Sequence, residues 1–439
     1  MTSVLDSVES PAGWERLPFG RLVQRSKQAG REDLQPLSVF LDEGVVPRAS
    51  REDNFNRLGA DMSKYLVVRP RDVVFNKLRT WQGGLGVSKY HGIVSPAYFV
   101  CRPRKGVESR FLHYMLRSVP YLAELTRVSK FMPPSQFDIL WDDLRLVPIL
   151  LPPSEEQRAI ADYLDAETAR IDALIAKKRR LIELLDERRT SMIHAGVSGH
   201  LASDAAARSS LPGLDDLGTR DPRAAPRGDG VRSLMPLKAV ATLLVSNVDK
   251  KTVEGETRVR ICNYVDVYYH DRITGALPFI TASATPSQIA LFELRRGDIL
   301  FTKDSETAAD VAVPAYVPDD LPGVVCGYHI EIARPRTDSV DSRYLFWALN
   351  SQFAREQFAV AATGVTRFGL RQDDTRSVRL PIPEVPTQRA IADYLDAETA
   401  RIDALIAKVR RHIELLGERR QALITAAVSG ELLVPGVAA

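Results

Sequence analysis

Residues 76–92, NKLRTWQGGLGVSKYHG, gather basic, aromatic and amide side chains around several glycines. Lysine and arginine can neutralise phosphate groups, and arginine and glutamine can also hydrogen-bond to the edges of bases. The glycines favour a turning backbone, so this stretch is expected to be a loop. The residues that could make such contacts are Lys77, Arg79, Trp81, Gln82, Lys89 and Tyr90. The stretch predicts a DNA contact; the alternative is a solvated, charged surface loop.

Three further stretches carry similar chemistry. FTKDSETAAD (301–310) has the position in the second half of the chain that NKLRTWQGG has in the first, while RVSKFMPPSQ (127–136) and TGVTRFGLRQ (363–372) precede long predicted helices. Their candidate DNA-binding residues are Lys303, Asp304, Ser305, Thr307, Lys130, Gln136, Arg367 and Arg371. The first loops of the two halves share a frame but differ in their side chains.

Signatures of catalysis were sought in the same regions. The sequence has no GxxxxGK[ST], GxGxxG, GxSxG or HExxH motif, and it lacks the Asn-Pro-Pro-Tyr type of tetrapeptide of amino-methylating enzymes. Asp72 with Lys77, and Asp298 with Lys303, suggest a nuclease, but the residue before each lysine is not acidic. Each aspartate is therefore predicted to stabilise a turn, and each lysine to face solvent or phosphate. His329 is expected to be a packed strand residue, and no catalytic or metal-binding residue is predicted.

A large repeat organises the elements that must position these loops. QRAIADYLDAETARIDALIAK occurs at residues 157–177 and again, unchanged, at residues 388–408. The match continues on both sides of this block. Farther upstream only some positions match, as where RPRDVVFNK (69–77) aligns with RRGDILFTK (295–303). The chain is therefore predicted to be two tandem units, each with a variable globular part followed by a shared helix.

The globular parts are predicted to be mixed α/β. Residues 73–75, 98–101, 298–301 and 329–333 have strand composition, and residues 111–117 and 344–353 are amphipathic in the manner of helices. Residues 202–231 are rich in Ala, Ser, Asp, Gly, Pro and Arg, which predicts a flexible linker. The predicted domains are a globular part at 13–152, a helix at 153–201, the linker at 202–231, a second globular part at 232–383 and a second helix at 384–432.

The repeated helix is predicted to begin at Ser154 as N-cap and to continue for about 40 residues, on the order of 60 Å at 1.5 Å per residue. Apolar residues recur near every seventh position, which predicts a seam between paired helices. The seam residues are Leu164, Ile171, Leu185, Met192, Ile160, Leu174 and Leu181, with Leu395, Ile402, Val409, Leu416, Leu423, Ile391 and Leu405 in the second copy. The alternative is that each helix packs only on its own globular part. In an antiparallel pair, Lys178 and His412 would lie near the middle.

Composition limits the kinds of partner and the location that the protein can have. The net charge of +3 comes from 59 basic and 56 acidic residues, so any DNA-binding face must be local. No apolar run approaches the roughly 20 residues that span a bilayer, and the start of the sequence does not read as a signal peptide, so a cytoplasmic location is expected. Cys101, Cys262 and Cys326 are widely spaced and are expected to be buried free thiols.

The chain has a duplicated helix of the type PPSEEQRAIADYLDAETARIDALIAK, with IELLDERR and AVSG-L after it and the motifs RRGDILFTKDSET and CGYH before it. In these residues the sequence closely resembles the specificity subunit of type I restriction-modification systems. The resemblance implies an α+β fold in which two target recognition domains are each followed by a long helix, the helices pairing as an antiparallel coiled coil with pseudo-twofold symmetry. It implies that each domain reads one half of a bipartite DNA sequence and that the half-sites differ. VPTQ in place of SEEQ weakens the start of the second helix.

The resemblance also implies partners. These are double-stranded DNA, two methyltransferase subunits and two motor-nuclease subunits, with S-adenosylmethionine, ATP and Mg in the partners and no cofactor in this chain. Candidate partner-binding residues on the outer helix faces are Arg158, Asp162, Arg170, Glu183, Glu187, Arg188, Arg389, Asp393, Arg401, Glu414, Glu418 and Arg419. Two alternatives stay open: a stand-alone bipartite DNA-binding protein, and a self-sufficient methyltransferase, which the missing motifs disfavour.

Overall fold

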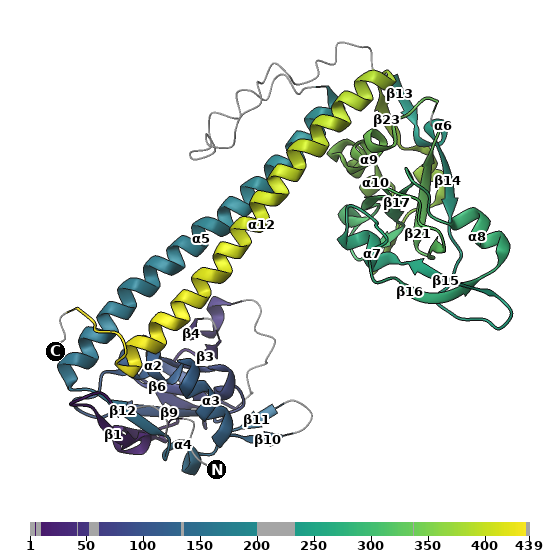
Figure 1. Ribbon diagram of the computed structural model, residues 1–439. Coiled ribbons are helices and arrows are strands. Elements are labelled where there is room, and N and C mark those ends of the chain that lie inside the picture. Colours follow the sequence, from purple (N-terminus) through teal and green to yellow (C-terminus); the bar gives the residue numbers. More distant parts are fainter. Residues whose placement is uncertain are drawn as a thin grey trace. The chain divides into compact units, whose positions relative to one another are not determined.

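The computed structural model describes residues 5, 10–41, 43–51, 61–132, 136–199, 233–336 and 338–435. The chain forms two compact units (Figure 1). Unit 1 comprises Met1–Arg179 and Val409–Ala439, and unit 2 comprises Arg180–Lys408. The predicted linker at 202–231 lies outside the described residues, and the domain boundaries predicted from the sequence stay predictions.

The globular part of unit 1 is built around a four-stranded sheet of order β2-β9-β6-β7, with short two-stranded ladders β1-β12, β3-β4, β5-β8 and β10-β11 around it. Its strands are β1 (Glu15–Pro18), β2 (Val23–Ser26), β3 (Leu37–Phe40), β4 (Gly44–Pro47), β5 (Leu66–Val68), β6 (Val73–Asn76), β7 (Leu85–Val87), β8 (Gly92–Val94), β9 (Tyr98–Pro103), β10 (Lys130–Met132), β11 (Gln136–Asp138) and β12 (Pro148–Leu151). Its helices are α1 (Phe19–Leu22), α2 (Ser109–Leu116), α3 (Val119–Val128) and α4 (Trp141–Leu144), with 3₁₀ turns η2 (Arg48–Ser50) and η3 (Thr80–Gln82).

The globular part of unit 2 follows the same plan, with a four-stranded sheet β14-β21-β17-β19, a three-stranded sheet β16-β15-β20, and ladders β13-β23 and β18-β22. Its strands are β13 (Ser233–Pro236), β14 (Ala241–Val245), β15 (Thr257–Cys262), β16 (Ile280–Ala284), β17 (Ile299–Thr302), β18 (Asp304–Ser305), β19 (Pro314–Tyr316), β20 (Val324–Cys326), β21 (Ile330–Pro335), β22 (Phe368–Gly369) and β23 (Arg379–Ile382). Its helices are α6 (Leu237–Val240), α7 (Tyr264–Tyr269), α8 (Pro286–Phe292), α9 (Ser342–Asn350), α10 (Gln352–Ala361) and α11 (Gln372–Ser377), with the 3₁₀ turn η7 (Ala308–Asp310).

Most of the elements predicted from composition are confirmed. The four predicted strands lie in β6, β9, β17 and β21, and the first predicted amphipathic helix is α2. The helix predicted at residues 344–353 is wrong as one element, because Ser351 separates α9 from α10. The Ser351 hydroxyl caps α10 by accepting a hydrogen bond from the backbone N–H of Ala354 at 3.4 Å. The three cysteines are buried free thiols, as predicted.

The two repeated segments form the long helices α5 (Ser154–Ser198) and α12 (Val385–Ser429), each of 45 residues. Alanine, leucine, glutamate, lysine and arginine dominate both, and these residues favour helices. Pro386 does not delay the start of α12, because the first turn of a helix needs no backbone N–H from proline. No helix in the described part of the chain is long and apolar enough to cross a membrane.

The helices run antiparallel within each unit (Figure 1). In unit 1, Asp172 pairs with Arg420 at 3.0 Å, and farther along α5 the Lys178 Nζ lies 3.3 Å from the His412 Nδ1. In unit 2, Arg189 pairs with Asp403 at 3.2 Å. Asp172 and Asp403 are the same position of the repeat, as are Arg189 and Arg420. The same ion pair therefore occurs twice with the two helices exchanged, as expected of an antiparallel pair of duplicated helices.

The predicted seam is largely confirmed, because Leu164, Ile171, Leu185 and Met192 are buried. The seam is narrower than predicted at one place, since Leu174 is 44% exposed. In each unit the seam is continuous with the core of the globular part. Leu164 shares a cluster with Phe111 and Ile424 in unit 1. Each helix therefore packs both on its partner helix and on its own globular part, so the alternative of packing on the globular part alone is wrong.

Candidate nucleic-acid interface

Two loops that are far apart in the sequence meet in unit 1. The Trp81 ring in η3 packs on the Phe137 ring of β11, with 4.9 Å between ring centroids, and Phe137 in turn contacts Phe131 of β10 at 5.1 Å. The backbone N–H of Ile139 donates to the carbonyl of Lys77 at 3.3 Å. These contacts bring the predicted first loop of unit 1 against the β10-β11 hairpin, at the end of the sheet where β6 ends.

The residues predicted in these two loops differ in how free their side chains are. Arg79, Gln82 and Lys130 are exposed. Lys77 is half-buried, donates to the Pro96 carbonyl at 3.0 Å and lies 4.9 Å from the centroid of the Phe99 ring. The Gln136 side chain lies outside the described part of the structure.

Lys89 and Tyr90 lie apart from the rest of the predicted set. They follow β7, whose residue Val87 pairs with Val73 at the start of β6, whereas Gln82 lies near the other end of the same ladder. Lys89 is exposed, and half-buried Tyr90 packs against the small core beneath β3 and β4. The structure therefore divides the first loop between two ends of one pair of strands.

Unit 2 joins its two predicted loops by strand pairing. Asp304 and Ser305 form β18, which pairs with Gly369 and Phe368 of β22. The backbone N–H of Leu370 adds a hydrogen bond to the carbonyl of Lys303 at 3.0 Å. The first loop and the last loop therefore meet in this unit too, although by different contacts.

The side chain of Asp304 is the centre of a small polar cluster. One of its carboxylate oxygens accepts a hydrogen bond from the Arg367 Nε at 3.1 Å and pairs with the Arg367 Nη2, and the other oxygen contacts the His329 Nδ1. Only 15% of the Asp304 side chain is exposed, whereas 59% of the Arg367 side chain is. Asp304 thus orients Arg367.

His329 is not the packed strand residue that the sequence predicts. It lies in a turn before β21 with φ of 70°, and its side chain is 35% exposed. Its ring lies 4.1 Å from the Tyr328 ring. The CGYH sequence was the only local indication that His329 is functional. It could not show that His329 contacts Asp304, because Asp304 comes from the distant strand β18.

The remaining predicted residues of unit 2 fall into two groups. Thr307, Arg367 and Arg371 are exposed, and Ser305 is buried. Lys303 is half-buried near Glu331, a fully buried acid whose Oε1 accepts from the Thr375 hydroxyl at 3.2 Å. Burial raises the pKa of Glu331 to about 7. Among the described residues, Glu331 Oε2 has no hydrogen-bond partner.

The aspartates that suggested a nuclease are structural, as predicted. Asp72 is 1% exposed, accepts from the backbone N–H of Arg69 at 2.9 Å and pairs with Arg102 at 3.2 Å. Asp298 makes the corresponding contacts with Arg295 and Arg334 in unit 2. Among the described residues, no group of three or more His, Cys, Asp or Glu is placed to hold a metal ion.

One feature of the repeated helices was not anticipated from the sequence. Gln157 is buried and accepts a hydrogen bond from the backbone N–H of Glu108 at 2.8 Å, while its Nε2 donates to the carbonyls of Pro152 at 2.8 Å and Gly106 at 3.3 Å. We call these three bonds the glutamine clasp. The sequence feature that could have indicated the burial of Gln157 is its place on the apolar stripe of the helix, three residues before Ile160.

The same clasp is present in unit 2. Gln388 accepts from the backbone N–H of Asp341 at 2.7 Å and donates to the carbonyls of Pro383 at 2.7 Å and Ser339 at 3.2 Å. Each clasp fixes the start of a long helix to the loop that leads into α2 or α9. The identical helix residues thus serve the docking of two different globular parts.

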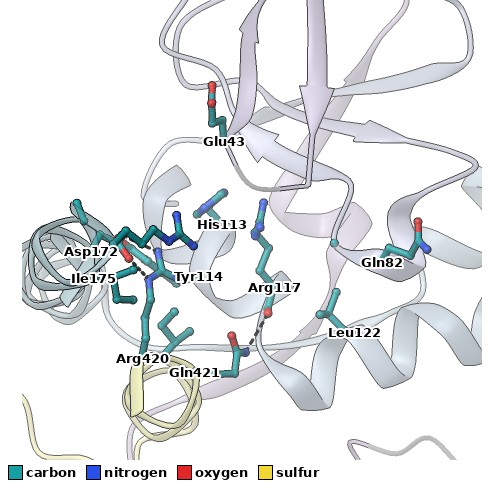
Figure 2. Close-up of a pocket in the computed structure, with 14 residues that line it drawn as sticks. Glu43, Gln82, His113, Tyr114, Arg117, Leu122, Asp172, Ile175, Arg420 and Gln421 are labelled. Carbon is teal, nitrogen blue, oxygen red and sulfur yellow. Dashed lines mark hydrogen bonds and ion pairs between the residues drawn. The ribbon is translucent and has the colours of Figure 1, made fainter. Parts of the chain in front are cut away.

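A cavity of about 540 Å³ lies in unit 1 where the globular part meets α5 and α12 (Figure 2). Figure 2 shows the Asp172–Arg420 ion pair on one side of it and Gln421, whose Nε2 donates to the Arg117 carbonyl at 3.3 Å. Burial lowers the pKa of His113, which also lines the cavity, to about 3. The cavity belongs to the packing of the globular part on the helix pair.

Comparison with known proteins supports the resemblance drawn from the repeat. The chain is 28% identical over 93 residues to the type I restriction enzyme StySPI specificity subunit of Salmonella potsdam, and the match covers 21% of this chain and 20% of that protein. It is 25% identical over 139 residues to a putative type I restriction enzyme MjaX specificity subunit of Methanocaldococcus jannaschii, covering 31% of each. The aligned stretches thus span a third or less of these relatives. No protein-family model matches the chain.

A solved structure matches almost the whole chain. It is described as "Structural basis underlying complex assembly and conformational transition of the type I R-M system", and one of its chains superposes with a TM-score of 0.65 and 18% identity, covering 97% of this chain and 100% of that one. The resemblance to type I specificity subunits is confirmed. The fold of this chain, with two mixed α/β globular parts and two long antiparallel helices, is shared with that chain of the type I R-M system.

In this fold, several predicted partner-binding residues already contact their own unit. Asp162 pairs with Arg110 at 2.7 Å, and Asp393 pairs with Arg343 at 2.7 Å, so these acids help to dock the globular parts. Arg389 also reaches its globular part, since it pairs with Asp341, the N-cap of α9. The other ion pairs lie along the helices: Arg170 with Glu167, Arg401 with Glu398, Glu183 and Glu187 with Arg180, and Glu414 and Glu418 with Arg411. Arg158 and Arg419 are exposed, and Arg188 is half-buried. Their roles as partner contacts stay predictions.

Proposed function

We propose that this chain is the sequence-specific DNA-recognition subunit of a type I restriction-modification complex. In this function it reads a bipartite DNA target with a fixed non-specific gap and positions methyltransferase and motor-nuclease subunits. The chain itself is non-catalytic. The observation that carries the proposal is that each unit brings together two loops of dissimilar sequence, while the helices that follow are docked by the same glutamine clasp.

The loops supply the chemistry for reading DNA. Exposed Arg79, Gln82 and Lys130 in unit 1, and Thr307, Arg367 and Arg371 in unit 2, combine phosphate neutralisation with donors for base edges. Because the two sets differ, each unit would select a different half-site. The phosphate contacts would make affinity depend on salt, while a few contacts with bases would give the sequence preference.

The helices supply what the two halves have in common. Two reading heads joined by stiff helices would recognise two half-sites at a fixed spacing on one duplex. Matching outer faces on the two helices would hold two copies of one methyltransferase, and then two motor-nuclease subunits. S-adenosylmethionine, ATP and Mg would bind in those partners, and the target adenine would be flipped into a methyltransferase pocket.

The first test is co-expression with a methyltransferase subunit, co-purification and sequencing of the methylated bases in the host genome. The expected result is a stable complex and one bipartite motif with a constant gap. A continuous motif, or no motif despite a stable complex, would contradict the proposal.

A second test changes the spacing. Insertion of one heptad into both α5 and α12 is expected to change the gap and leave both half-sites unaltered, because a heptad preserves the seam. The control inserts a heptad into α5 alone, which makes α5 longer than α12, so the two helices can no longer pair along their whole length. Altered half-sites with an unchanged gap would show that the helices do not set the spacing.

A stand-alone bipartite DNA-binding protein is the alternative function. Such a protein would bind its target tightly without partners, which an electrophoretic mobility assay of the isolated chain measures. A self-sufficient methyltransferase would instead bind S-adenosylmethionine as an isolated chain.

A further inference from the structure

A basic pocket lies in the unit 1 globular part at the start of β6, away from η3 and the β10-β11 hairpin. It has a volume of about 480 Å³ and is lined by six cationic side chains and two carboxylates. The cationic residues are Arg69, Arg71, Arg102, Arg104, Lys105 and Arg158. They come from the turn before β6, from the end of β9 and the segment after it, and from the first turns of α5. Lys77, at the edge of the reading loops, follows the opposite end of β6.

Within the described part of the structure, most of this positive charge is not neutralised. Arg102 is committed to buried Asp72, and the Arg71 guanidinium lies 3.7 Å from Glu108. Exposed Arg104, Lys105 and Arg158 form no ion pair with any described residue. Several like charges around one concave surface repel one another, and an anion held between them would relieve that repulsion.

The backbone at Arg71 gives a second, independent reason to assign a function to this pocket. Arg71 has φ of 75°, a left-handed conformation that is unfavourable for any residue with a Cβ. Gly297 has the corresponding position in unit 2, with φ of 89°. The two turns are otherwise the same, since the Arg71 N–H donates to the Ser88 carbonyl at 2.8 Å and the Gly297 N–H donates to the Val317 carbonyl at 2.8 Å. Unit 1 thus places an arginine where the same turn in unit 2 has the unstrained residue.

Strain retained at one residue is a sign that its side chain is needed. We propose that this pocket is an anion site that binds a phosphate-bearing ligand, with Arg71, Arg104 and Arg158 as its principal contacts. Guanidinium groups suit phosphate because their fork of N–H donors matches two phosphate oxygens. A volume of about 480 Å³ has the size of a small-molecule site, so a compound with one or more phosphate groups fits. A phosphate of a DNA backbone offers the same chemistry.

The test is isothermal titration calorimetry of the full chain with sodium pyrophosphate at low ionic strength, in wild type and Arg71→Gly. The expected result is that Arg71→Gly weakens pyrophosphate binding about tenfold, the usual effect of losing one charge-assisted contact. The melting temperature should not fall, because glycine is the residue that unit 2 uses in this turn. Arg21→Gln, which removes one exposed charge on α1 outside the pocket, is the matched control and should bind as wild type does. Arg158→Gln is a second variant with the same expected loss.

A parallel titration with a short duplex of arbitrary sequence distinguishes the two sources of phosphate. If Arg71→Gly weakens pyrophosphate binding alone, the site takes free phosphate compounds, and if it weakens only duplex binding, the ligand is the DNA backbone. If it weakens both, the site binds phosphate groups from either source. The proposal is overturned if Arg71→Gly binds both ligands as wild type does, or if wild type binds neither. None of these readouts depends on a methyltransferase partner, so the anion site can fail while the proposed DNA-recognition function stands, and the reverse.

Discussion

Gln157 and Gln388, at the same position of the repeat, are both buried and make the same three hydrogen bonds in their separate units. Each side chain accepts one backbone N–H and donates to two carbonyls. The repeat therefore has an internal reason to be identical in its first turns, in addition to any shared partner. Each globular part is attached to its helix by the same residue.

Loss of one clasp should destabilise its own unit. Gln157→Ala would leave a buried N–H and two carbonyls without partners, and we expect a loss of about 3 kcal/mol in the free energy of unfolding. Chemical denaturation, monitored through hydrogen exchange of the unit 1 core, measures this loss. Glu155→Ala, exposed in the same helical turn, is the control and should stay within about 0.5 kcal/mol of wild type. Equal stability of Gln157→Ala and wild type would show that the clasp contributes nothing.

Replacement of Gly417 should stabilise α12. Gly417 is exposed inside the helix, and an added Cβ would meet nothing within 4 Å. Gly417→Ala is therefore expected to raise the free energy of unfolding by about 1 kcal/mol, the difference in helix propensity. Asp186 has the same position in α5, and Asp186→Gly should lower stability by a few tenths of a kcal/mol. Thermal denaturation of both variants measures these changes. If Gly417→Ala and Asp186→Gly changed the stability in the same direction, helix propensity would not be the explanation.

Glu331 should make unit 2 less stable as pH rises. Burial raises its pKa in the folded protein to about 7 from an ordinary value of 4.5. Between these values the folded protein holds a proton that the unfolded chain has lost, so stability falls with rising pH by about 1.4 kcal/mol per pH unit. Glu331→Gln should remove this dependence, be close to wild type below pH 4.5 and be more stable above pH 7. Melting temperatures across this range measure it, with exposed Glu254→Gln as the control.

His113 should act in the opposite direction in unit 1. Burial lowers its pKa in the folded protein to about 3 from 6.5, so the unfolded chain takes up a proton first and stability falls as pH drops below 6.5. His113→Phe, which copies Phe346 at the equivalent position of unit 2, should reduce the loss between pH 6.5 and pH 3 by about 1.4 kcal/mol per pH unit. The control is exposed His412→Gln. Acid unfolding of His113→Phe parallel to that of wild type would show that His113 is not the cause.

The sequence by itself determined the duplicated plan and the pairing of the helices. A heptad spacing is local, and it predicts an apolar seam in any context, so it predicts the burial of Leu164 and Leu185 that the structure shows. The turn role of Asp72 was also predictable, because its neighbours in the chain supply one of its partners. The exposure of Leu174 was not, because the width of a seam depends on what packs beside it.

Only the tertiary structure decided which loop residues act together. Lys303 and Arg367 are brought to one place by the pairing of β18 with β22, and the separation of Lys89 from Gln82 follows from the β6-β7 ladder. It also showed that Asp304 is engaged with Arg367 and His329. Such contacts join residues tens of positions apart, and no periodicity records them. Helix pairing could be predicted because it depends on repeated local spacing, whereas the reading surface depends on single long-range contacts.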